Sequence, residues 1–190
     1  MRAAHTRDVI LDVVDALLAR YGYNKMTIDD VAAAAGIGKG TIYLHFESKE
    51  DLVLSHVDRI VERVVARLAD LAASRAPWPG RVRRMLRERV LMRLDAVQHY
   101  SESLSELLAA IRPALLVRHK QHFAREAEAL ARPLAEAGFR PEAALETAQA
   151  MLIATNALLP FSLSARELGA RAEIQRKVDR IAALLVKGAR

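Results

Sequence analysis

Cysteine is absent from this 190-residue chain, and so is any long uncharged apolar run. Without cysteine there can be no disulfide, no thiol nucleophile and no thiolate metal site. No stretch approaches the ~18 apolar residues that a membrane-spanning helix needs. The N-terminal MRAAHTRD also lacks the apolar segment of a secretory signal. These absences predict a cytoplasmic protein that makes no use of a membrane.

Patterns that carry catalysis or bind cofactors are also missing. No Ser-His-acid or HExxH arrangement is readable. Residues 36–41, GIGKGT, differ from a phosphate-binding loop, because Gly40 separates the lysine from the threonine and an alanine-rich helix precedes them. His119, His122 and Glu126 share a helical face, but with no further ligands nearby they are interpreted as solvated surface residues. We therefore expect no enzyme, no metal and no cofactor.

Apolar residues recur at helical spacing along almost the whole chain. Hydrophobic residues make up 52% of it, which excludes a disordered protein, and nothing reads as strand-turn-strand. The prediction is an all-α fold of about nine helices, three of them in an N-terminal module. After a long helix from Ser48 to the Pro-rich break at 76–80, the expected helices are 81–97, one through 104–111, one opened by Pro113 and ending at Gly138, 142–159 and 165–187.

The most specific segment is Thr27–Phe46, TIDDVAAAAGIGKGTIYLHF. Thr27 and Asp30 have the spacing of a helix N-terminal capping pair. Gly36 stands where the first helix must stop, with the positive φ that glycine tolerates best. Ile42 would anchor a second helix whose remaining side chains are mostly polar. This pattern indicates a helix-turn-helix whose second helix reads DNA.

Extended to GIGKGTIYLHFESKEDLV, the segment resembles the DNA-binding module of TetR/AcrR-type repressors. The similarity covers roughly residues 6–60 and lies in the Ala-Gly-Ile turn, the Gly-Thr-Ile-Tyr core and the Phe46, Ser48, Lys49, Leu52 sequel. It implies a DNA-binding domain at 1–47 and a helical effector-binding and dimerisation domain at 48–190. Such a repressor would bind a double-stranded DNA operator and be released by a small-molecule effector.

The same resemblance assigns DNA contacts residue by residue. It implies that Thr27, Tyr43 and Lys49 bind phosphates, and that Lys39, Gly40, Thr41 and His45 face base edges or adjacent backbone. Lys39 can donate to guanine, and the Thr41 methyl can meet a thymine methyl. Leu44 departs from the family pattern, since many relatives carry a polar residue there.

The net positive charge of the chain is weak evidence for DNA binding, because the basic residues lie mostly outside the helix-turn-helix. The chain carries +6, yet residues 1–56 hold six Lys/Arg against eight Asp/Glu, and the basic excess lies in the remainder. Within that remainder, a run of arginines extends from Arg81 to Arg93, and Arg112 follows. Such a run is usually a solvated face, but one or two of these residues could turn inward and bind an anionic ligand.

The rows of apolar residues along the C-terminal helices suggest two further roles. The last two long helices, 142–159 and 165–187, are candidates for a homodimer interface, although they could equally close only the monomer core. An apolar effector pocket is expected on type and position alone. Its candidate lining residues, with plain core as the alternative, are Met85, Met92, His99, Tyr100, Arg112, Phe123, Met151, Asn156 and Phe161. The alternative function is a helical-bundle protein-interaction module without DNA binding.

Overall fold

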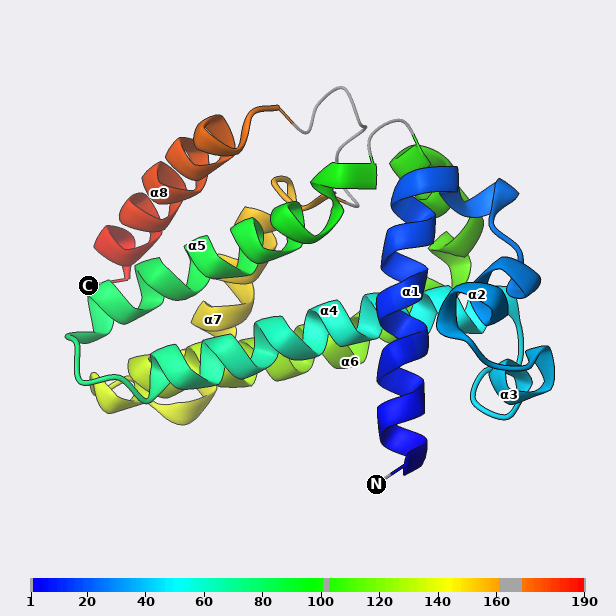
Figure 1. The fold of residues 1–190 in the computed structure, drawn as a ribbon. Helices are drawn as coiled ribbons and strands as arrows, with labels where there is room; N and C mark the ends of the chain where they lie inside the picture. Colours follow the sequence, from blue (N-terminus) through cyan, green and yellow to red (C-terminus); the bar gives the residue numbers. More distant parts are fainter. Residues whose placement is uncertain (1, 101–102, 161–168, 190) are drawn as a thin grey trace. The chain divides into compact units, whose positions relative to one another are not determined.

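The computed structural model describes residues 2–100, 103–160 and 169–189. These ranges contain only helices (Figure 1), which confirms the all-α class. The elements are α1 (Arg2–Lys25), α2 (Ile28–Ala35), α3 (Lys39–Tyr43), α4 (Lys49–Ala72), α5 (Trp78–Val97), the 3-10 turn η1 (Gln98–Tyr100), α6 (Ser103–Glu136), α7 (Pro141–Asn156) and α8 (Arg171–Gly188).

Two expected boundaries were wrong. Pro113 does not open a new helix, because α6 runs through it without a break. An internal proline removes one helical hydrogen bond, but its fixed φ near −65° is itself helical, and the turns before it are held by buried Leu104, Leu107 and Ile111. The last helix begins at Arg171 rather than 165, after Gly169 with φ 57°.

The chain forms two compact units. Unit 1 comprises residues 1–60 and 99–117, and unit 2 comprises residues 61–98 and 118–190. Both α4 and α6 therefore contribute residues to each unit. The expected division into a DNA-binding and an effector-binding domain at 47/48 stays a prediction. No helix in the described ranges combines the length and the apolar character needed to cross a membrane.

In unit 1, α1 packs on α2 and α2 on α3, and the start of α6 contacts α1. The Glu106 carboxylate accepts a hydrogen bond from the backbone N–H of Asn24 at 2.9 Å. The backbone of α1 is interrupted at Gly22, whose φ of 73° and ψ of 171° are not helical. This interruption, next to Ser103, lets the end of α1 approach α6 closely.

Unit 2 is a helical core in which α5 lies beside α8 and both contact α7 (Figure 1). Its centre is built from buried aliphatic side chains such as Val82, Leu86, Leu130, Leu152 and Val186. Trp78 and Phe139 meet edge to face at the border of this core. The sequence stripes in these helices are thus buried faces, as helical periodicity predicts.

Candidate nucleic-acid interface

The start of α2 is capped as the sequence predicts. The Thr27 hydroxyl oxygen accepts a hydrogen bond from the Asp30 N–H at 3.1 Å, and Asp30 Oδ2 accepts one from the Thr27 N–H at 2.9 Å. This reciprocal capping box satisfies two N–H groups of the first turn. Hydrogen bonds from Thr27 also lower the pKa of Asp30. Thr27 therefore has a structural role at this helix end, whatever else it contacts.

The turn between α2 and α3 is made by Gly36. Its φ of 66° and ψ of 31° are left-handed, and its N–H reaches the Ala32 and Ala33 carbonyls. A side chain in this conformation would be strained, which explains why glycine is needed. Gly38 then caps α3 from an extended conformation. The predicted helix-turn-helix is therefore present.

Apolar anchors fix α3 against the rest of unit 1. Ile42 is fully buried, as are Val31 of α2 and Ile10, Leu11 and Val14 of α1. Phe46 is also buried, and the Arg7 guanidinium lies 5.2 Å from the centre of its ring. These contacts determine which side of α3 faces inward.

The opposite side of α3 is open. Leu44 is 83% exposed and Tyr43 is 50% exposed. Lys39 and Gly40 are exposed, whereas Thr41 and His45 are half-buried. An added Cβ at Gly40 would meet nothing within 4 Å, so close approach to another molecule is possible there. All the side chains expected to face base edges therefore lie on or beside this short helix.

Lys39 already has a partner within the module. Its ammonium lies 2.9 Å from Asp29 Oδ2, at the start of α2. The hydrogen bond to this carboxylate raises the pKa of Lys39. Both side chains are well exposed, so the pair is open to exchange. A guanine would have to compete with Asp29 for the lysine.

Lys49 also makes contacts within the unit. Its ammonium donates to the backbone carbonyls of Tyr23 at 2.8 Å and of Met26 at 3.0 Å, and lies 4.4 Å from the Tyr23 ring centre. The lysine thus caps the end of α1. An ammonium has three N–H donors, so one remains for a phosphate. Its expected role in DNA binding stays a prediction.

Comparison with known proteins supports this geometry. Residues 10–55 match the family described as bacterial regulatory proteins, tetR family. An HTH-type transcriptional regulator of Staphylococcus aureus is 31% identical over 80 residues, which cover 42% of each chain. The BepR repressor of Brucella suis is 39% identical over 57 residues, covering 30% of this chain and 27% of BepR.

Residues 10–55 are a TetR-family DNA-binding domain.

The similarity to these two regulators spans less than half their length. A longer but weaker match, 26% over 144 residues, relates this chain to the KstR2 repressor of Mycobacterium tuberculosis, covering 72% and 70% of the two chains. A solved TetR-family regulator of Mesorhizobium loti has a TM-score of 0.70 at 18% identity, covering 99% and 98%. At that identity the likeness shows the fold alone.

The residues expected to line an effector pocket are distributed over both units, and their role in binding an effector stays a prediction. Met85 and Met151 are buried in the core of unit 2, and Met92 and Phe123 pack partly buried against it. His99 and Tyr100 belong to unit 1, as does Arg112. The idea that Arg112 turns inward is wrong, because it is exposed. Phe161 lies outside the described residues.

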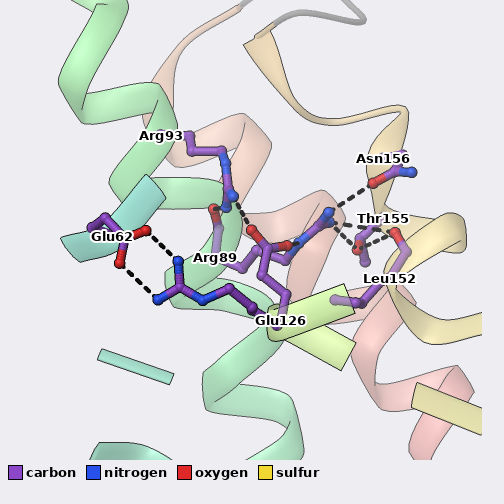
Figure 2. Close-up of polar contacts among 8 residues, drawn as sticks. Glu62, Arg89, Arg93, Glu126, Leu152, Thr155 and Asn156 are labelled. Atoms are coloured by element: carbon purple, nitrogen blue, oxygen red, sulfur yellow. Dashed lines mark hydrogen bonds and ion pairs between the residues drawn. The ribbon is translucent and has the colours of Figure 1, made fainter. Parts of the chain in front are cut away.

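Sequence reasoning missed a buried charged cluster in unit 2. Arg89 of α5 and Glu126 of α6 are each 1% exposed, and Arg93 is 9% exposed. Arg89 Nε donates to Glu126 Oε2 at 2.6 Å, and Arg93 pairs with the other carboxylate oxygen (Figure 2). Glu126 is thus not the solvated surface residue that was expected. The arginine run hinted at an inward side chain, but its spacing alone did not identify which one.

Arg89 is the structural centre of this cluster. It also donates to Thr155 Oγ1 at 3.1 Å, to the Leu152 carbonyl at 3.3 Å and to Asn156 Oδ1 at 2.8 Å (Figure 2). Burial lowers the pKa of Arg89, and Glu126 offsets this in part. Burial acts to raise the pKa of Glu126, but Arg93 and Arg89 outweigh it and lower the pKa. Through these contacts, the side chains of Arg89, Arg93 and Glu126 join α5, α6 and α7.

A second polar network, in unit 1, was also missed. The Tyr100 hydroxyl donates to Asp15 Oδ1 at 2.6 Å, and buried His56 Nε2 lies 2.8 Å from the same hydroxyl. Burial acts to raise the pKa of Asp15, but hydrogen bonds from His56 and Tyr100 hold it well below its usual range. Tyr100, proposed from sequence as a pocket residue, is here a link between α1, α4 and η1. No sequence motif brings these three residues together.

Proposed function

We propose that this TetR-family chain is a homodimeric, effector-responsive repressor of transcription that binds a near-palindromic DNA operator. The observation that carries the proposal is the outer face of α3, which presents Lys39, Gly40 and Leu44 while Ile42 holds the helix from behind. A helix anchored in this way can enter a major groove with its polar side chains against base edges. Repression is inferred from the similarity to BepR and KstR2, which are both HTH-type transcriptional repressors.

A dimer is needed because a single short helix contacts too few base pairs to select a site in a genome. Two copies related by a two-fold axis would read two half-sites and favour a near-palindrome. The proposed contacts to phosphate are Thr27, Tyr43 and Lys49, and those to bases or adjacent backbone are Lys39, Gly40, Thr41, Leu44 and His45.

The proposed interface uses α7 and α8. Large apolar side chains are exposed on both helices, with Ile153 at 63% and Leu184 at 64%. Exposed Glu142 lies on α7, whereas exposed Arg180 and Lys187 flank Leu184 on α8. When α8 of one copy packs on α7 of its partner, apolar residues meet and opposite charges face each other. Such complementarity suits an isologous contact.

The effector is proposed to bind among the helices of residues 48–190. α4 contains residues of both units, since the division of the chain falls between residues 60 and 61 of this helix. An effector that binds better to one tilt of α4 would shift the population toward that tilt, and with it the distance between the two α3 helices of the dimer. The operator would then be released without any contact between effector and DNA.

The test is selection of random duplex DNA by the purified protein at two salt concentrations. We expect a near-palindromic site whose affinity falls steeply with salt. Leu184→Glu should give a monomer by analytical ultracentrifugation and lose the site, while Arg176→Glu on the same helix serves as the charge control. Absence of any enriched sequence, together with salt-independent behaviour, would favour the alternative of a protein-interaction module.

A further inference from the structure

The buried cluster of Arg89, Arg93 and Glu126 holds more positive than negative charge. It contains two guanidinium groups and one carboxylate, a net charge of +1. Among the described residues, Glu126 is the only buried acidic side chain. Buried charges are normally paired, because an uncompensated charge loses its hydration without replacement. The excess therefore requires an explanation.

The two arginines differ in how fully the protein satisfies them. Arg89 directs N–H groups at Glu126, Thr155, Asn156 and a backbone carbonyl, which accounts for most of its five donors. To the described residues, Arg93 donates only two hydrogen bonds, one to Glu126 and one to the Arg89 carbonyl at 3.1 Å. Its side chain is 11% exposed, against 1% for Arg89. Arg93 is thus the more exposed of the two arginines and the one with fewer hydrogen bonds to the described residues.

The helices that carry this cluster also carry apolar side chains of the unit 2 core, and His119 lies within electrostatic range of Arg93. Met92 is the neighbour of Arg93 in the chain, Phe123 lies one turn before Glu126, and Met151 lies one turn before Thr155; all three belong to or pack on the core of unit 2. A guanidinium at the edge of an apolar core suits a molecule with one anionic group and a hydrocarbon body. Carboxylates match the guanidinium fork with paired hydrogen bonds.

We propose that Arg93, held in place by the Arg89–Glu126 pair, binds the carboxylate of the effector, and that the effector is an organic acid with an apolar body. The role as effector rests on the function proposed above. Binding of such an acid brings a second anion to the two guanidiniums and neutralises the excess charge. Glu126 competes with the incoming carboxylate for Arg93, so the site discriminates between anionic and neutral molecules of the same shape.

The experiment is isothermal titration of the full chain with butanoate, octanoate and dodecanoate, each compared with its primary amide. The amide keeps the shape and removes the charge. We expect at least one acid to bind about tenfold to a hundredfold more tightly than its amide, the size of one hydrogen bond to a charged group. Equal affinity of acids and amides, or binding of none of the acids, would overturn the proposal.

Variants test whether Arg93 is the group that recognises the carboxylate. Arg93→Met should abolish the preference for acid over amide, Arg93→Lys should retain part of it, and Arg125→Met should leave it unchanged. Arg125 is a matched control on α6, since its guanidinium forms an exposed bidentate pair with Glu62 (Figure 2). Glu126→Gln removes the competing carboxylate and should tighten acid binding, which a purely structural role does not predict. A preference that survives in Arg93→Met refutes the assignment.

Operator binding by the same preparation separates the two proposals. Acid binding that requires Arg93, in a protein that selects no DNA, would leave this site standing and remove the regulator function. DNA selection without any binding of acids would do the reverse. Thermal unfolding of each variant, followed by circular dichroism, establishes that the compared proteins are folded. Bound acid should also raise the melting temperature of the wild-type chain.

Discussion

Gly22→Ala should be among the most damaging single substitutions in unit 1. The backbone at Gly22 has φ 73° and ψ 171°, a region that is almost restricted to glycine. Placing an alanine there costs about 1–3 kcal/mol for the backbone conformation alone. The chain must adopt it nonetheless, because Met26 N–H bonds to the Gly22 carbonyl at 3.2 Å and the end of α1 lies against α6.

The new methyl group would also overlap with α6. A Cβ built on Gly22 lies 2.9 Å from Ser103 Cβ, closer than two such carbons approach in proteins. Both atoms are attached directly to backbone, so no change of rotamer relieves the overlap. Overpacking of this kind costs about 1–3 kcal/mol. Together the two effects give a loss of about 2–6 kcal/mol in the free energy of unfolding.

Urea unfolding at fixed protein concentration would measure this loss. Gly36→Ala is the matched control, because Gly36 also has positive φ, at 66°, but a Cβ there meets nothing within 4 Å. It should cost only about 1–2 kcal/mol. In a Ser103→Gly background, Gly22→Ala should recover the steric part of its cost and keep the backbone part. The reasoning is refuted if Gly22→Ala costs no more than Gly36→Ala, or if Ser103→Gly changes nothing.

Three further predictions concern charged side chains. Asp29→Asn should tighten operator binding by releasing Lys39, and have no such effect in a Lys39→Met background, as measured by fluorescence anisotropy. Lys49→Met should lower the salt slope of DNA binding by about one and also reduce stability, because its ammonium caps α1; Lys39→Met should spare stability. The folded-state pKa of Asp15 is depressed, so its stabilising effect is complete above its unfolded pKa near 3.9 and is lost as the pH falls below it. The free energy of unfolding of Asp15→Asn should therefore fall less steeply with decreasing pH than that of the wild type. Urea unfolding at a series of pH values would measure this, and an identical pH dependence of the two proteins would contradict the role of Asp15.

Local interactions explain why the helix-turn-helix could be predicted so well. Its capping box joins residues three apart, and its turn depends on the conformational freedom of a single glycine. Both are properties of short sequences, so Thr27, Asp30 and Gly36 could be assigned before any packing was known. The all-α class followed in the same way from helical periodicity. The predicted break at Pro113 failed because a proline removes one helical hydrogen bond without preventing a helical φ, and the buried turns before it hold α6 in place.

The sequence by itself determined the fold class, the position of the reading helix and the side of that helix that faces outward. Only the tertiary structure decided which arginines of the basic run are buried. Arg89 and Glu126, for example, are separated by 37 residues and meet only in the folded unit 2. The same holds for Asp15 and Tyr100, separated by 85 residues. A buried charge is stable only beside its partner, and which residues become neighbours across helices is set by packing rather than by local spacing.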